Sequence, residues 1–86
     1  MEIKIVELKD DFVKMIIKKE DHTYLNLLQY ELLNTEGVLL AKYNIPHPLR
    51  EEAELVVRTE NRNPIDAIKK ANERIIKLVN VVLSQL

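Results

Sequence analysis

The chain contains no cysteine, no tryptophan and only one glycine among its 86 residues. Without cysteine it has neither a disulfide framework nor a zinc cluster built on thiolates. One glycine and three prolines are too few for a collagen-like or low-complexity chain, and they exclude a glycine-rich phosphate-binding loop. Because 47% of the residues are hydrophobic and 31% are charged, we expect one globular domain over residues 1–86.

An excess of charge of one sign is also lacking. Thirteen basic and fourteen acidic residues give a net charge of −1, so no overall field attracts the chain to nucleic acid or to an acidic membrane. Charges interrupt the apolar stretches, which stay well below the ~20 residues of a membrane helix. Residues 1–4 lack the apolar core of a signal peptide, and we expect a cytoplasmic protein.

Residues that could perform catalysis are few. The single serine, Ser84, has no histidine near it in the sequence, so no nucleophile is indicated. Asp21 and His22 could act as an acid/base pair, but a polar segment directly before an apolar run is more often a helix cap, which we favour. His22 and His47 do not have the spacing of a metal site. We therefore expect no catalytic residue, no metal ion and no cofactor.

The first 18 residues predict a β-hairpin. Apolar residues alternate up to Ile5 and change phase at Val6, which is typical of a strand with a bulge over residues 2–8. After a polar turn at residues 9–11, a second alternation over residues 13–18 indicates a half-buried strand.

A helix is expected over residues 24–33. Asp21 and Thr23 are good capping residues directly before this run, and Gly37 follows its end. The apolar residues form a stripe and also extend well outside it, so we expect neighbours on more than one side of the helix. The stripe consists of Leu25, Leu28 and Leu32, with Tyr24 beside it and Leu27, Tyr30 and Leu33 outside it.

Two further strands, at residues 38–43 and 54–59, are expected to pair antiparallel. Between them, Pro46 and Pro48 cannot donate ladder hydrogen bonds, so residues 45–49 must form a loop or a strand edge.

The last helix is expected to run from Pro64 to the C-terminus, because Asn63 is a good N-cap and proline suits the first helical position. Its apolar residues form a heptad seam with one polar member, Asn72, which we interpret as fixing the register or choice of a pairing partner. The seam consists of Ile65, Ile68, Asn72, Ile75, Val79, Val82 and Leu86, and the flanks carry Ile76, Leu78, Val81 and Leu83. So much apolar surface on the last turns indicates cover from outside the chain, although a helix packed on its own sheet would have a similar seam.

The densest basic run lies on the same helix and consists of Lys69, Lys70, Arg74 and Lys77. It could contact phosphates, but Asp66 and Glu73 lie beside these residues and aromatic residues for base stacking are absent nearby. We favour a solvated helix face without direct contact with nucleic acid.

The expected order is ββαββα, which indicates an α+β fold of two layers. One layer is a four-stranded, mostly antiparallel sheet and the other holds the two helices.

Two strings in the sequence are more specific than this fold class. Residues 21–28, DHTYLNLL, and residues 43–49, YNIPHPL, resemble subunit L of archaeal RNA polymerase in their order and spacing. The resemblance covers nearly the whole chain. It departs at Leu25, where the family usually has a small residue, most often glycine, and where leucine favours helix formation.

The resemblance implies a non-catalytic assembly subunit, similar in fold to the dimerisation domain of the bacterial polymerase α subunit. It would form a heterodimer with the larger D subunit of the polymerase, and the large catalytic subunits would assemble on this heterodimer. The residues implied in or near the partner contact are Leu25, Leu28, Leu32, Ile68, Ile75, Val79 and Val82. Those implied as structural or docking motifs are Asp21, His22, Thr23, Asn26, Tyr43, Pro46, His47 and Pro48. The alternative is a self-associating α+β interaction domain unrelated to transcription, which uses the same helices in a homodimer.

Overall fold

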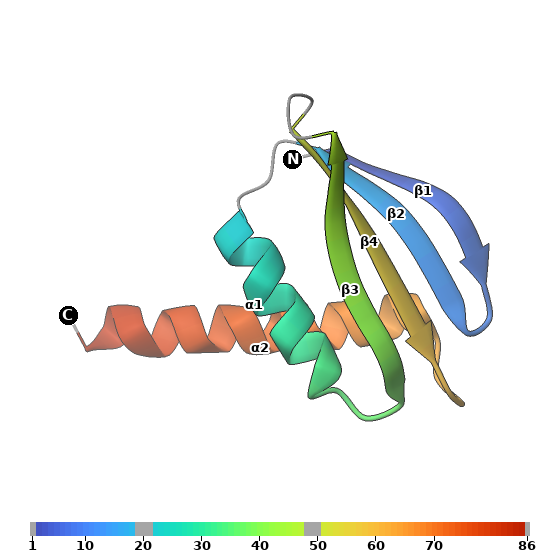
Figure 1. The fold of residues 1–86 in the computed structure, drawn as a ribbon. Coiled ribbons are helices and arrows are strands. Elements are labelled where there is room, and N and C mark those ends of the chain that lie inside the picture. The colour runs from blue at the N-terminus through green and yellow to red at the C-terminus, as the bar shows by residue number, and fades with distance from the viewer. Residues whose placement is uncertain (1, 19–21, 48–50, 86) are drawn as a thin grey trace.

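The helices and strands follow one another in the predicted order, with both helices packed on one face of a single sheet (Figure 1). The computed structural model describes residues 2–18, 22–47 and 51–85. The elements are β1 (Glu2–Lys9), β2 (Phe12–Lys18), α1 (His22–Leu33), β3 (Val38–His47), β4 (Glu52–Thr59) and α2 (Pro64–Ser84). The α+β class is confirmed, with one layer of strands and one of helices.

The strands lie in the order β1-β2-β4-β3, and each neighbouring pair is antiparallel. β1 and β2 form the predicted hairpin about a turn at Asp10 and Asp11. The expected bulge is confirmed, because the pairing register shifts between Ile5 and Glu7. β1 and β3 therefore form the two edges of the sheet.

β3 is longer than expected and ends at His47 rather than at Tyr43. The sequence predicted either a loop or a strand edge at residues 45–49. The structure shows the second, since residues 45–47 end the edge strand β3. Pro46 is compatible with it, because an edge strand has a neighbour on one side only and the register shifts between Asn44 and His47. Pro48 lies outside the described residues.

The core lies between the helices and the face of the sheet that they cover. β2 and β4 alternate between buried and more exposed residues, which confirms the period-2 pattern of the sequence. The buried hydrophobic residues are Val13, Met15, Ile17, Leu25, Leu28, Leu32, Ala41, Ala53, Leu55, Val57, Ala67, Ala71 and Ile75. They come from both helices and from β2, β3 and β4, so this core holds the helix layer on three of the four strands.

The ends of α1 differ from the expectation in one respect. α1 begins at His22, so Thr23 lies within its first turn and is not its cap, while Asp21 lies outside the described residues. After α1, Gly37 has a φ of 88° in the turn to β3, and a Cβ atom there would lie 3.1 Å from the backbone oxygen of Glu60. Glycine suits both the positive φ and this close approach.

Candidate functional site

The first half of α2 is fixed against the rest of the chain. Asn63 caps the helix as predicted, because its side-chain oxygen accepts hydrogen bonds from the backbone N–H groups of Ile65, at 2.8 Å, and Asp66, at 3.2 Å. The helix then contacts β2, β4 and α1. Ala67 and Ala71 are completely buried there, and their small side chains let the helix approach its neighbours closely.

The buried line of α2 differs from the predicted heptad seam. The seam places Ile65 and Ile68 on the contact line, but both are only partly buried, at the margin of the core. The buried residues are Pro64, Ala67, Ala71 and Ile75. α2 therefore meets its own chain along a line beside most of the seam, because a close helix contact selects small side chains. That the seam contacts a partner stays a prediction.

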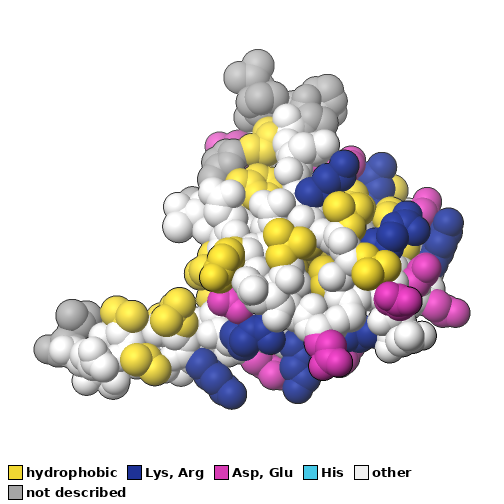
Figure 2. Space-filling view, turned by 60° about the horizontal axis from the view of Figure 1, so that its bottom comes forward, with side chains coloured by type: hydrophobic (Ala, Val, Ile, Leu, Met, Phe, Trp, Pro, Cys, Tyr) yellow, Lys and Arg dark blue, Asp and Glu magenta, His cyan; other side chains and the backbone are white. Residues whose placement is uncertain are grey.

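The second half of α2 leaves the body of the molecule. Figure 1 shows it extending beyond α1, and Figure 2 shows it as an arm that carries hydrophobic side chains. We name residues 76–84 the α2 arm, which is about 13 Å long at ~1.5 Å per residue. Its exposed side chains, with the accessible fraction of each, are Ile76 (60%), Leu78 (50%), Val79 (48%), Val81 (53%), Val82 (54%) and Leu83 (60%). They form the excess of apolar surface that the sequence predicted for the last turns.

The apolar surface of the α2 arm is too wide for a single flat contact. At about 100° per residue, the six exposed apolar side chains span roughly 220° around the helix axis. Lys77, Asn80 and Ser84 occupy the remaining polar stripe. A helix that is apolar over most of its circumference is normally buried on more than one side. The α2 arm therefore offers apolar surface to a partner on more than one side.

Arg74 fixes the direction of α2 where it passes α1. Its Nε donates to the Glu31 carboxylate at 2.8 Å, and its Nη2 donates to the backbone oxygen of Glu31 at 2.7 Å and to the hydroxyl of Thr35. The sequence interpretation placed Arg74 on a solvated face with Lys70 and Lys77. The two lysines are exposed, but Arg74 is an interhelical contact that spacing within one helix does not reveal.

Asn72 also has a partner within the chain. The Tyr24 hydroxyl donates a hydrogen bond of 2.5 Å to the side-chain oxygen of Asn72, across the contact between α1 and α2. This bond accounts for the polar member of the predicted seam without a second polypeptide. The interpretation that Asn72 fixes the register or choice of a pairing partner stays a prediction beside this internal role.

The residues predicted to contact a partner fall into two groups. The buried group consists of Leu25 (1% accessible), Leu28 (2%), Leu32 (0%) and Ile75 (8%), with Ile68 partly buried beside it. In this conformation these residues have little accessible surface, and the three leucines pack in the core of their own chain. Their place in or near a partner contact stays a prediction. Val79 and Val82 instead lie on the exposed α2 arm. The other apolar residues of the arm were noted only as flanks of the seam.

Two of the predicted motif residues come together between α1 and β3. The Tyr43 hydroxyl donates to the side-chain oxygen of Asn26 at 2.5 Å, and nearby Gln29 Nε2 donates to the backbone oxygen of Ala41 at 3.1 Å. Both bonds tie α1 to the edge strand, which gives Asn26 and Tyr43 a structural role. Of the remaining motif residues, Thr23 is exposed on α1, His22 begins α1, Pro46 and His47 end β3, and Asp21 and Pro48 lie outside the described residues.

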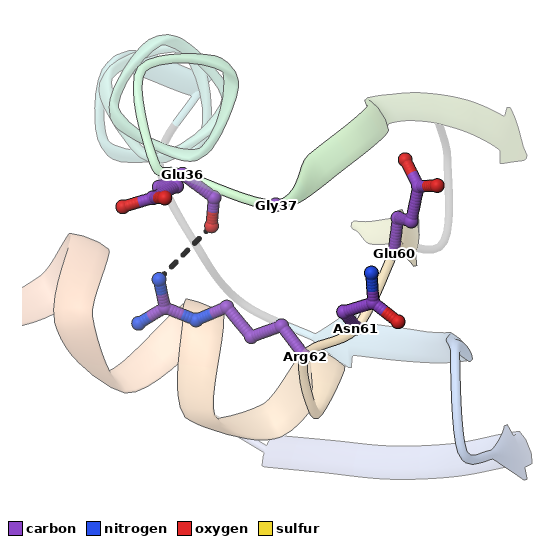
Figure 3. A pocket seen from close by; sticks show the side chains of 5 residues that line it. All are labelled: Glu36, Gly37, Glu60, Asn61 and Arg62. Atoms are coloured by element: carbon purple, nitrogen blue, oxygen red, sulfur yellow. Dashed lines mark hydrogen bonds between the residues drawn. The ribbon is translucent and has the colours of Figure 1, made fainter.

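A pocket of about 500 Å³ lies where the turn after α1 meets the turn after β4 (Figure 3). It is lined by Glu36, Gly37, Glu60, Asn61 and Arg62. Arg62 Nη1 donates to the backbone oxygen of Glu36 at 2.9 Å, and the backbone N–H of Glu60 donates to the backbone oxygen of Gly37 at 2.7 Å. These groups hold the two turns together, and we assign them a structural role.

Neither helix, over the part of the chain that the structure describes, is long and apolar enough to cross a membrane. Within residues 2–18, 22–47 and 51–85, no three metal-ligating side chains are grouped so that they could hold a metal ion.

The fold and the α2 arm together define a class of protein, a small two-layer α+β domain whose last helix projects beyond its own core. A family model described as the RNA polymerase Rpb3/Rpb11 dimerisation domain matches residues 13–85. The chain belongs to this family.

Its relatives are subunits of archaeal RNA polymerases. The chain is 50% identical to the DNA-directed RNA polymerase subunit Rpo11 of Archaeoglobus fulgidus over 86 residues, which are the whole of both chains. It is 36% identical to Rpo11 of Methanocaldococcus jannaschii over an alignment of 95 positions, which covers 100% of this chain and 96% of the relative. The crystal structure of DNA-directed RNA polymerase subunit L from Thermoplasma acidophilum superposes with a TM-score of 0.87 at 26% identity, over 98% of this chain and 83% of that one. The resemblance to archaeal subunit L is thus confirmed, and with it a place in transcription.

Proposed function

We propose that the chain is a non-catalytic assembly subunit of a cytoplasmic DNA-directed RNA polymerase. It forms a heterodimer with the D subunit of that polymerase, and the heterodimer is the platform on which the large catalytic subunits assemble. Residues 1–86 act as one dimerisation domain. The observation that carries the proposal is the α2 arm, with six apolar side chains that are each about half accessible in a member of a dimerisation-domain family.

Burial of the α2 arm favours association with a partner, but it does not by itself account for tight binding. Full burial of a large apolar side chain contributes ~1.5–3 kcal/mol, so six half-accessible ones contribute about 5–9 kcal/mol. Association costs about 4–15 kcal/mol in lost freedom of the two chains. A tight heterodimer therefore needs a partner surface that covers the arm well, together with further contacts.

The proposal is tested by changing Val82 to glutamate and measuring binding of the full chain to the D subunit. Val82 lies near the middle of the apolar arc, so Val82→Glu buries an unpaired carboxylate and should raise the Kd by about 100-fold or more. Asn80→Glu is the matched control, because it adds the same charge to the polar stripe of the same arm. It should change the Kd by less than about threefold.

Three results would contradict the proposal. One is that Val82→Glu and Asn80→Glu both bind the D subunit as tightly as the unmodified chain does. Another is that both variants lose binding to the same extent. The third is a tight homodimer of the unmodified chain that ignores the D subunit, which would favour a self-associating domain.

A further inference from the structure

A second apolar surface lies on β1, at the edge of the sheet. Ile3, Ile5 and Leu8 pair with three buried core residues of β2. Directly paired residues of an antiparallel sheet point to the same face, so the apolar face that the helices cover continues onto β1. There it is open, because Ile3 is 56%, Ile5 49% and Leu8 54% accessible. We name these three residues the β1 patch.

We propose that the β1 patch receives the last helix of the partner in the heterodimer. This inference rests on the proposed function and assigns the surface of this chain that covers the partner's counterpart of the α2 arm. β1 spans Glu2–Lys9 and so lies outside the residues 13–85 that match the dimerisation-domain model.

The position of α2 explains why a helix suits this place. α2 packs on β2 and β4, and β1 is the next strand beyond β2, so the helix layer ends one strand short of the edge (Figure 1). A partner helix that runs antiparallel to α2 would extend this layer, with its last turns on the β1 patch. Two chains of the same fold, related by an approximate two-fold axis, would each place an arm on the other's β1 patch.

The wide apolar arc of the α2 arm supports the same geometry. One neighbouring helix covers only one side of an arm that is apolar over about 220°. Insertion between the partner's helices and the open part of its sheet covers the second side as well. The family is described by Rpb3 and Rpb11 together as one dimerisation domain, which favours two chains of like fold. A partner helix of the same kind would bring an apolar surface that matches the β1 patch.

The edge of β1 is less suited to binding than its face. The edge carries a bulge between Ile5 and Glu7, and charged residues recur along it at Lys4, Glu7 and Lys9. Bulges and charges on an edge strand oppose the addition of another strand. A helix on the apolar face is therefore favoured over an extended segment at the edge.

The test uses single cysteines as probes, because the chain has no cysteine of its own. Ile5→Cys and Leu8→Cys each place a thiol in the β1 patch. Lys4→Cys is the matched control, because Lys4 pairs with Ile16 on the opposite face of the same strand. Each full-length variant is alkylated with iodoacetamide, alone and in complex with the D subunit, and the mass of this chain is followed with time.

In the complex, alkylation at positions 5 and 8 should slow by about tenfold or more, since a covered thiolate is inaccessible, while position 4 changes by less than about twofold. Unchanged rates at positions 5 and 8 in an intact heterodimer would overturn the inference and leave the proposed function standing. Slowing that appears only after the large subunits are added would also overturn it. If the unmodified chain fails to bind the D subunit, the proposed function fails, and this inference fails with it.

Discussion

Single polar side chains fix how α1 and α2 pack against each other. The bond from the Tyr24 hydroxyl to Asn72 is partly buried and joins residues far apart in the sequence. We expect Asn72→Leu and Tyr24→Phe each to lower the free energy of unfolding, because each removes this bond. A double-mutant cycle in urea should give a coupling energy of about 1 kcal/mol.

The chain offers a matched control for this cycle. Tyr43 makes a bond of the same length to Asn26, but at an exposed site between α1 and β3. Tyr43→Phe combined with Asn72→Leu should therefore be additive. If Asn72→Leu changed the choice of partner and left the stability of the free chain unaltered, Asn72 would act in partner choice and not in the packing of α1 on α2.

At the scale of whole elements, the sequence predicted order and type well, because local chemistry decides them. The period-2 alternation, the phase change in β1 and the cap at Asn63 all act within a few residues, and the structure confirms them. Burial was harder to predict, because it depends on what each helix meets. Leu25 was predicted in or near a partner contact and Ala71 was not singled out at all, and burial of both in the core of the free chain was not predicted.

Arg74 also joins the two helices, two residues before the α2 arm begins. Arg74→Met keeps most of the apolar stem of this side chain but removes its bonds to Glu31 and Thr35. Because Arg74 is partly exposed, we expect the free energy of unfolding to fall by only about 1–2 kcal/mol.

Lys70→Met is the control for Arg74→Met, since Lys70 lies one turn earlier on the same helix and is exposed. Its Nζ lies 4.0 Å from Oε2 of Glu73. The substitution should change stability by less than about 0.5 kcal/mol. Equal effects of the two substitutions in thermal or urea unfolding would show that the Arg74 contacts do not hold the helices together.

At the scale of the whole molecule, the chain is more extended than a compact domain of its length. Its radius of gyration is 13.3 Å, whereas about 12 Å is expected for 86 residues. The principal extents are 40 × 36 × 16 Å, the shape of a thin sheet-and-helix layer with a projecting arm. Two of its exposed apolar surfaces, the α2 arm and the β1 patch, lie at the margin of the buried core or beyond it, so a partner can cover them without opening it.

This arrangement predicts two levels of protection along one helix. In the free chain, the buried residues of α2 end at Ile75, so the core holds the backbone amides up to that residue, whereas the exposed residues of the α2 arm oppose local opening less. Hydrogen exchange should therefore be slow in residues 67–75 and fast in residues 78–84.

Binding of the D subunit should slow hydrogen exchange in the α2 arm by about 100-fold and leave the exchange of residues 67–75 nearly unchanged, because a ligand stabilises the segments that it orders. The Val82→Glu chain, mixed with the same partner at the same concentrations, serves as control and should keep the fast exchange of the arm. Uniform protection along the whole of α2 in the free chain would mean that the arm is already covered, and the heterodimer would then need another interface.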